Sequence, residues 1–132
     1  MRAITCWSKQ LKSDKGGIFL NVVEIAQLAA TAAEEKKAQD IIILDIRGLS
    51  VFADYFVICH GNSQTQVQAI VNGIKDKVLE SDLILKGIEG FQDARWVLID
   101  LGDVVVHVFH KDEREFYDLE RLWGDARQLK VQ

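Results

Sequence analysis

The residues best suited to binding a phosphate are Gly61-Asn62-Ser63, which lie between an apolar run and a stretch with helical periodicity. A junction between a strand and a helix places backbone amides at the helix N-terminus, where an anion binds well. This junction, however, lacks the lysine of a Walker loop and the three-glycine spacing of a dinucleotide-binding fold. The simpler interpretation, a turn in which Ser63 caps the following helix, is therefore favoured.

The acidic and histidine side chains are not spaced as a catalytic or metal site requires. Asp100 and Asp103 lie on either side of a predicted turn, whereas the metal-holding carboxylates of a nucleotidyltransferase would alternate along one strand face. His107 and His110 are three residues apart, which sends them to opposite faces of an extended strand. Because no cluster of Cys and His accompanies them, we expect His107 to be a hydrogen-bonded sheet residue, and we predict no metal and no cofactor.

The stretch Arg95–His110 contains two runs of β-branched and large apolar residues. Gly102-Asp103 separates the runs, and glycine at the first of two turn positions predicts a hairpin of type II′. In the first run, Trp96, Leu98 and Asp100 share one face by the two-residue period, and the alternate residues share the other. The second face belongs to the core. The first face suits either a covered layer or an exposed recognition surface.

Helices are predicted where apolar residues follow helical spacing behind a capping box. The first runs from Asn21, with Glu24 as its partner, to about Glu35. The second follows Ser63 and Gln66. The third follows Asp112 and Glu115, and its apolar stripe consists of Phe116, Leu119, Leu122 and Trp123.

Strands are predicted at three apolar runs besides the hairpin. Ile41–Ile46 suits a central strand covered on both faces, Tyr55–His60 follows it, and a third strand of uncertain length begins at Leu83. The order αββαβββα predicts one α/β domain, with a mixed sheet of about five strands and flanking helices. We assign residues 1–20 to an extension or flexible tail, residues 21–126 to the domain, and residues 127–132 to a C-terminal tail.

Composition and charge restrict the compartment and the partner. The chain has 132 residues, of which 48% are hydrophobic, so it is long enough and apolar enough to fold around a core. Cys6 and Cys59 make no disulfide framework, and no export signal or membrane span is recognised, so we expect a cytoplasmic protein without membrane contact. Four of the 16 cationic residues but only one of the 20 acidic residues lie within residues 1–20, which leaves the rest of the chain at a net −7. Direct specific binding of nucleic acid is therefore not expected, and a basic protein partner fits better.

Several motifs occur in the order in which a known family has them: Asp45–Gly48 with Ser50, Asp54–Ile58, Gly61–Ser63 with Gln66-Val67, Glu89-Gly90, Trp96–Asp100, Gly102–Phe109, Arg114-Glu115, Tyr117 and Leu119–Trp123. Across about residues 21–126 the chain thus resembles the ribosomal silencing factors, also called iojap-like proteins. The resemblance implies a nucleotidyltransferase-like sheet without the catalytic acids, in agreement with the missing carboxylate pair. It also implies a translational repressor that is not an enzyme.

Family members bind the large ribosomal subunit through ribosomal protein fourteen and sterically block joining of the small subunit, so the resemblance implies the same partner here. Residues with suitable chemistry within the shared motifs are expected to form the docking surface: Tyr55, Trp96, Leu98, Asp100, Asp103, Arg114 and Tyr117. Two alternatives remain open. One is a divergent metal-dependent nucleotidyltransferase that uses Ser63 and nearby acids, and the other is a homodimerisation module.

Overall fold

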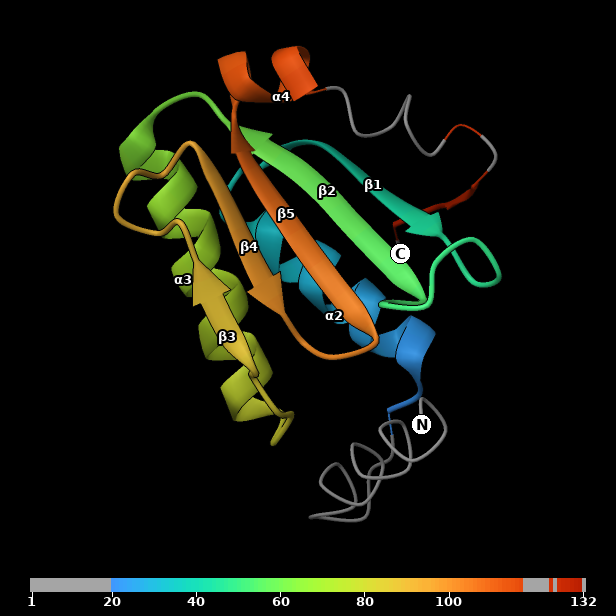
Figure 1. Cartoon of the computed structure of the whole chain (residues 1–132). Coiled ribbons are helices and arrows are strands. Elements are labelled where there is room, and N and C mark those ends of the chain that lie inside the picture. The colour runs from blue at the N-terminus through green and yellow to red at the C-terminus, as the bar shows by residue number, and fades with distance from the viewer. Residues whose placement is uncertain (1–19, 118–123, 125, 132) are drawn as a thin grey trace.

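One sheet with helices packed on it forms the described part of the chain (Figure 1). The computed structural model describes residues 20–117, 124 and 126–131, and for residues 115–117 it describes the backbone alone. The helices are α2 (Val22–Glu35), α3 (Gln64–Glu80) and α4 (Lys111–Tyr117). The strands are β1 (Gln39–Asp45), β2 (Tyr55–Gly61), β3 (Gly87–Glu89), β4 (Trp96–Asp100), β5 (Val104–His110) and β6 (Arg127–Leu129).

The sheet is mixed and has the order β3-β4-β5-β2-β1-β6. Its two central strands, β2 and β5, run parallel, and every other neighbouring pair is antiparallel. The predicted α/β class with a mixed sheet is thus confirmed. β1 was expected to be central, but it lies one strand from the edge.

The sixth strand comes from residues that were predicted to be a tail. Residues 127–129 form β6, in which Leu129 pairs with Ile43 and Arg127 pairs with Asp45. The side-chain amide of Gln27 on α2 also donates to the Lys130 carbonyl at 2.8 Å. The assignment of 127–132 to a tail was therefore wrong for its described part, because this segment pairs with the edge of β1 and is held against α2. Of the predicted extension, residues 1–20, only Leu20 lies within the described residues.

Helices α2 and α3 cover one face of the sheet, which is the far face in Figure 1. Fully buried alanines on α2, among them Ala26, Ala29 and Ala33, let this helix approach the strands closely. Its predicted N-terminal capping box is present, because Asn21 Oδ1 accepts from the Glu24 N–H at 2.9 Å and Glu24 Oε1 accepts from the Asn21 N–H at 3.0 Å. None of the described helices combines the length and apolarity needed to cross a bilayer.

The third strand begins later than predicted. Leu83 is 6% exposed and packs in the core below α3, and its N–H donates to the Val78 carbonyl at 3.2 Å. Asp82, at φ +58°, turns the chain out of the helix. Leu83 thus completes the packing of the helix end, and the strand starts only at Gly87.

Helix α4 begins at Lys111, so Asp112 occupies a position inside the helix instead of the predicted cap. The Asp112 N–H donates to His110 Nδ1 at 3.3 Å, which gives His110 the capping contact. Of the predicted apolar stripe, Leu119, Leu122 and Trp123 lie outside the described residues, and Phe116 is described by its backbone alone.

The hairpin formed by β4 and β5 has its turn at the predicted position. Trp96 pairs with Phe109, Asp100 pairs with Val105, and the Leu101 N–H donates to the Val104 carbonyl at 2.9 Å. Gly102 has φ +94°, the positive value expected at the first turn position. The face that carries Val97 and Ile99 is fully buried under the helices, as predicted.

Candidate docking surface

The face of the sheet that points away from α2 and α3, here called the open face, carries the candidate site. Cross-strand pairing aligns Asp100 with Val105 and Val105 with Phe56, and the next row contains Leu98 and His107. The same side of the sheet carries a second apolar cluster, built on Leu44, Ile46, Ala53, Ile58 and Phe109. Five partly exposed residues of this face define what we call the docking surface: Phe56, Trp96, Leu98, Asp100 and Val105.

Contacts with His107 and Phe109 hold the indole of Trp96 in place. Its Nε1–H donates to His107 Nδ1 at 3.1 Å, and its ring stacks on Phe109 with centroids 5.1 Å apart. The His107 ring in turn meets the Phe56 ring edge to face at 4.6 Å. The hydrogen bond and the ring contacts thus fix the orientation of the Trp96 indole.

His107 is a hydrogen-bonded residue of the sheet, as predicted. Since Nδ1 accepts from Trp96, the proton of the neutral ring lies on Nε2, and this atom is buried without an acceptor among the described residues. Burial lowers the pKa of His107 to about 4. Within the described ranges, no three His, Cys, Asp or Glu side chains are grouped as metal ligands would be.

Asp100 serves both the turn and the surface. Its Oδ1 accepts from the Gly102 N–H at 2.8 Å and so stabilises the hairpin connection. The carboxylate remains partly exposed on the same face as Trp96 and Leu98. The docking surface therefore combines apolar and aromatic groups with a negative charge.

Two of the predicted docking residues are buried and do not lie on this surface. Tyr55 is 4% exposed and packs in the core on the helical side, so its neighbour Phe56 occupies the open face instead. Asp103 is 1% exposed, and its carbonyl accepts from the N–H groups of Asp54 at 2.7 Å and Tyr55 at 3.1 Å. The prediction was therefore wrong for both residues, because each is used inside the fold.

The other two predicted docking residues come from α4. Arg114 Nη1 donates to the Gln39 carbonyl at 3.3 Å and lies 3.0 Å from His60 Nδ1, so its guanidinium ties α4 to β1 and β2. Arg114 thus has contacts within the fold, and its role in docking stays a prediction. Tyr117 belongs to α4, but its side chain lies outside what the structure describes, so its role stays a prediction.

The turn at Gly61-Asn62-Ser63 has the capping structure that the sequence favours. Ser63 Oγ accepts from the Gln66 N–H at 3.1 Å, and Gln66 Oε1 accepts from the Asn62 N–H at 2.7 Å. Two backbone N–H groups that a phosphate would need as donors thus already donate to side-chain oxygens of the chain itself.

A Ser63→Ala variant is expected to lower the free energy of unfolding by about 1 kcal/mol, because the Gln66 N–H loses its acceptor. Chemical denaturation measures the loss. Ser63→Asp, which retains an acceptor oxygen, should stay close to the original stability. Equal stability of Ser63→Ala and the unaltered protein would contradict the capping role.

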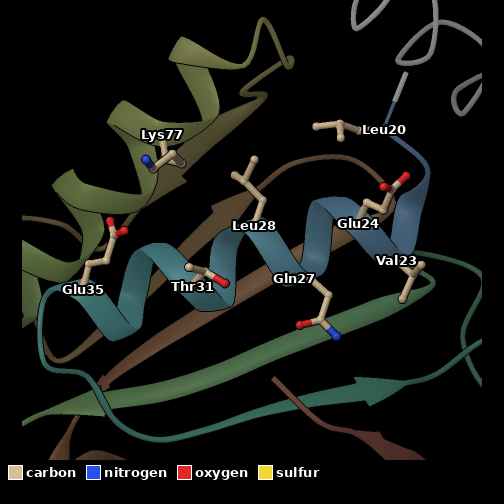
Figure 2. Close-up of a pocket in the computed structure, with 8 residues that line it drawn as sticks. All are labelled: Leu20, Val23, Glu24, Gln27, Leu28, Thr31, Glu35 and Lys77. Carbon is tan, nitrogen blue, oxygen red and sulfur yellow. The ribbon is translucent and has the colours of Figure 1, made fainter. Parts of the chain in front are cut away.

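The hollows on the described surface include the following three. The first, of about 480 Å³, follows α2 on the helical side, where Leu28 and Thr31 lie along it and Lys77 of α3 lies beside it (Figure 2). A second, of about 680 Å³, is lined by Asp45, whose pKa is lowered by its hydrogen bond to Arg47. The third, of about 310 Å³, lies on the open face and is lined by Glu89, Gly90, Trp96 and Leu98.

The prediction from sequence missed several surface residues. Phe56 and Val105 complete the docking surface, and Glu89 borders it, although Glu89-Gly90 is one of the shared motifs. Val51 and Phe52, 74% and 84% exposed, form an apolar tip on the connection between β1 and β2. That Glu89 projects to the same face as Trp96 follows only from the pairing of β3 with β4, which the sequence does not reveal.

Comparison with known proteins relates the chain to one family. The family model described as "Ribosomal silencing factor during starvation" (RsfS) matches residues 20–132. Ribosomal silencing factor RsfS of Bacillus subtilis is 60% identical over 107 residues, which cover 81% of this chain and 91% of that protein. A mouse protein named "Mitochondrial assembly of ribosomal large subunit protein 1" is 33% identical over 93 residues, covering 67% of this chain and 40% of that protein.

A solved structure shares the fold. A crystal structure of a Bacillus halodurans protein superimposes with a TM-score of 0.74 at 50% sequence identity, covering 83% of this chain and 99% of that one. The extent of the family match and the identity to the Bacillus subtilis protein agree with this likeness. The chain therefore belongs to the ribosomal silencing factor (RsfS) family.

Proposed function

We propose that this protein binds the large ribosomal subunit through ribosomal protein fourteen and blocks joining of the small subunit, thereby repressing translation. The main support is the docking surface, on which the fixed indole of Trp96 and the partly exposed carboxylate of Asp100 share the open face. Membership of the silencing factor family supports a role on the ribosome. The name of the mouse relative supports the choice of the large subunit.

The chemistry of the surface suits a basic protein better than ribosomal RNA. Outside residues 1–20 the chain carries a net −7, and an acidic surface repels phosphate. Trp96 and Leu98 supply an apolar centre, and Asp100 supplies charge at its margin. Aromatic anchors bordered by charge are typical of protein–protein contacts, in which the charge speeds association and selects the partner.

The proposed mechanism is steric and needs no covalent step. A folded domain that is bound where the two subunits meet occupies volume that the small subunit needs. Repression then depends on occupancy, because the bound fraction rises with the concentration of the factor relative to its dissociation constant. A homodimer formed through the same surface would compete with this binding.

The proposal is tested by sedimentation with purified ribosomal subunits. The protein should sediment with large subunits but not with small subunits, and free ribosomal protein fourteen should displace it. When small subunits are added, the fraction of joined ribosomes should fall as the protein concentration rises. Binding to small subunits alone, or joining that is unaffected at saturation, would refute the proposal.

An Asp100→Asn variant is expected to bind large subunits about 3- to 10-fold more weakly, because it removes one complementary charge. The amide oxygen of Asn can still accept from the Gly102 N–H, so the hairpin should keep its turn. Asp76→Asn on the exposed side of α3 removes the same charge on the helical side and serves as the control. If both variants bind equally, Asp100 has no specific role in docking.

A further inference from the structure

The hollow of about 310 Å³ on the open face lies at the edge of the docking surface, between β3 and β4. Glu89 and Gly90 line it from β3 and the turn that follows, and Trp96 and Leu98 line it from β4. It therefore joins an acidic side chain to the apolar centre of the surface. We refer to it as the Glu89 pocket.

The strand register explains why Glu89 lies beside the indole. Glu89 pairs with Leu98 across the antiparallel ladder, and paired residues project to the same face of a sheet. Ile88 pairs with Ile99 and faces the helical side. Glu89 thus shares the open face with Leu98 and, two residues along β4, with Trp96.

The walls of the pocket are fixed. The Trp96 ring is held by its hydrogen bond to His107 and by stacking on Phe109. Gly90 adopts φ +82°, and a Cβ at this position would collide with the Trp96 carbonyl oxygen. The turn after β3 therefore packs directly on β4 beside the indole.

The carboxylate of Glu89 is available to a partner. Glu89 is exposed, and none of the contacts found among the described residues pairs it with a cation. Arg95, the cation next to Trp96 in the sequence, is engaged elsewhere, since its Nε lies 3.2 Å from Glu113 Oε1. The pocket thus carries a negative charge that the described part of the fold does not neutralise.

From this arrangement we infer that the Glu89 pocket binds a cationic side chain of the basic protein partner, an arginine or lysine. The inference rests on the proposed function and adds the recognition chemistry of one subsite. The indole attracts a cation placed over it, and the carboxylate neutralises the same cation at the pocket rim. A guanidinium is the better match, because it is planar, weakly hydrated and able to stack while donating to a carboxylate.

A Glu89→Gln variant tests the inference, because it keeps the size of the side chain and removes its charge. The dissociation constant for purified large subunits is measured at low and at high salt. At low salt, the constant of Glu89→Gln should be about 5- to 10-fold higher than that of the unaltered protein. The difference should shrink at high salt, where exposed charges are screened. Glu80→Gln, an exposed position at the end of α3, should bind as the unaltered protein does.

The possible outcomes separate this inference from the proposed function. If the unaltered protein binds large subunits and Glu89→Gln binds equally well at low salt, the pocket does not bind a cation and the inference is overturned. An equal loss for Glu80→Gln would overturn it as well, because the effect would then arise from net charge. If the unaltered protein itself does not bind, the proposed function fails first.

Discussion

Replacing Trp96 by alanine should weaken binding to the large subunit by about 30-fold or more, since buried aromatic anchors contribute about 2 kcal/mol or more at protein interfaces. Trp96 contributes apolar area to the docking surface and also forms a wall of the Glu89 pocket. Its orientation is set before binding by His107 and Phe109. Removing the indole therefore removes its contact with the partner and one wall of the Glu89 pocket. Sedimentation or surface-immobilised subunits measure the change.

Controls for Trp96→Ala must separate lost contact from lost fold, because the substitution also leaves His107 Nδ1 without its donor and uncovers Phe109. Trp96→Phe preserves an aromatic ring over Phe109 and should give an intermediate affinity. Leu79→Ala truncates a 53% exposed apolar side chain on α3 and should leave binding unchanged. A folded Trp96→Ala protein that binds within twofold of the unaltered protein would remove Trp96 from the interface.

Stability should fall by about 3 kcal/mol as the pH decreases from 6.5 to 4, because of His107 alone. Burial lowers the pKa of this imidazole in the folded protein to about 4, whereas its ordinary value is 6.5. Between these two values the unfolded chain binds a proton that the folded chain does not bind. Acidification therefore favours unfolding. The stabilising effect of the neutral ring is complete above pH 6.5 and is lost as the pH falls through 4.

Denaturant unfolding at several pH values, for the unaltered protein and for His107→Gln, checks this expectation. Glutamine does not titrate, so the pH dependence of the variant should be flatter between pH 6.5 and 4 even if the variant is less stable throughout. The remaining histidines and carboxylates are common to both proteins, and the difference between the two curves isolates His107. Parallel curves would show that His107 is equally protonated in the folded and unfolded chains.

The helix start and the hairpin turn were predicted correctly because the residue pattern at each has only one physical interpretation. The Asn21 and Glu24 pair specifies a helix start, and Gly102-Asp103 permits a two-residue reversal. The alternation of Trp96, Leu98 and Asp100 with aliphatic residues identifies which face of β4 belongs to the core. The common strand face of Trp96, Leu98 and Asp100 could therefore be predicted from the sequence, whereas their role in docking stays a prediction.

The incorrect assignments fell where the residue pattern does not distinguish two arrangements. In β2, Tyr55 and Phe56 are adjacent aromatics in a run that is apolar on both faces, so the pattern does not say which of them faces the helices. Asp103 is an acid at a turn and would ordinarily be solvated, but here it is buried, and its carbonyl organises the start of β2. Glu89 required the pairing of β3 with β4, which is a long-range property.

The pairing of β6 with β1 has a consequence for the nascent chain. The outer edge of β1 receives its partner from residues 127–129, which are synthesised well after β1 itself. Until those residues emerge from the ribosome, the backbone N–H and C=O groups at that edge lack this partner strand, and open strand edges promote association between chains. Translation that stalls before residue 127 should therefore yield fragments prone to aggregation.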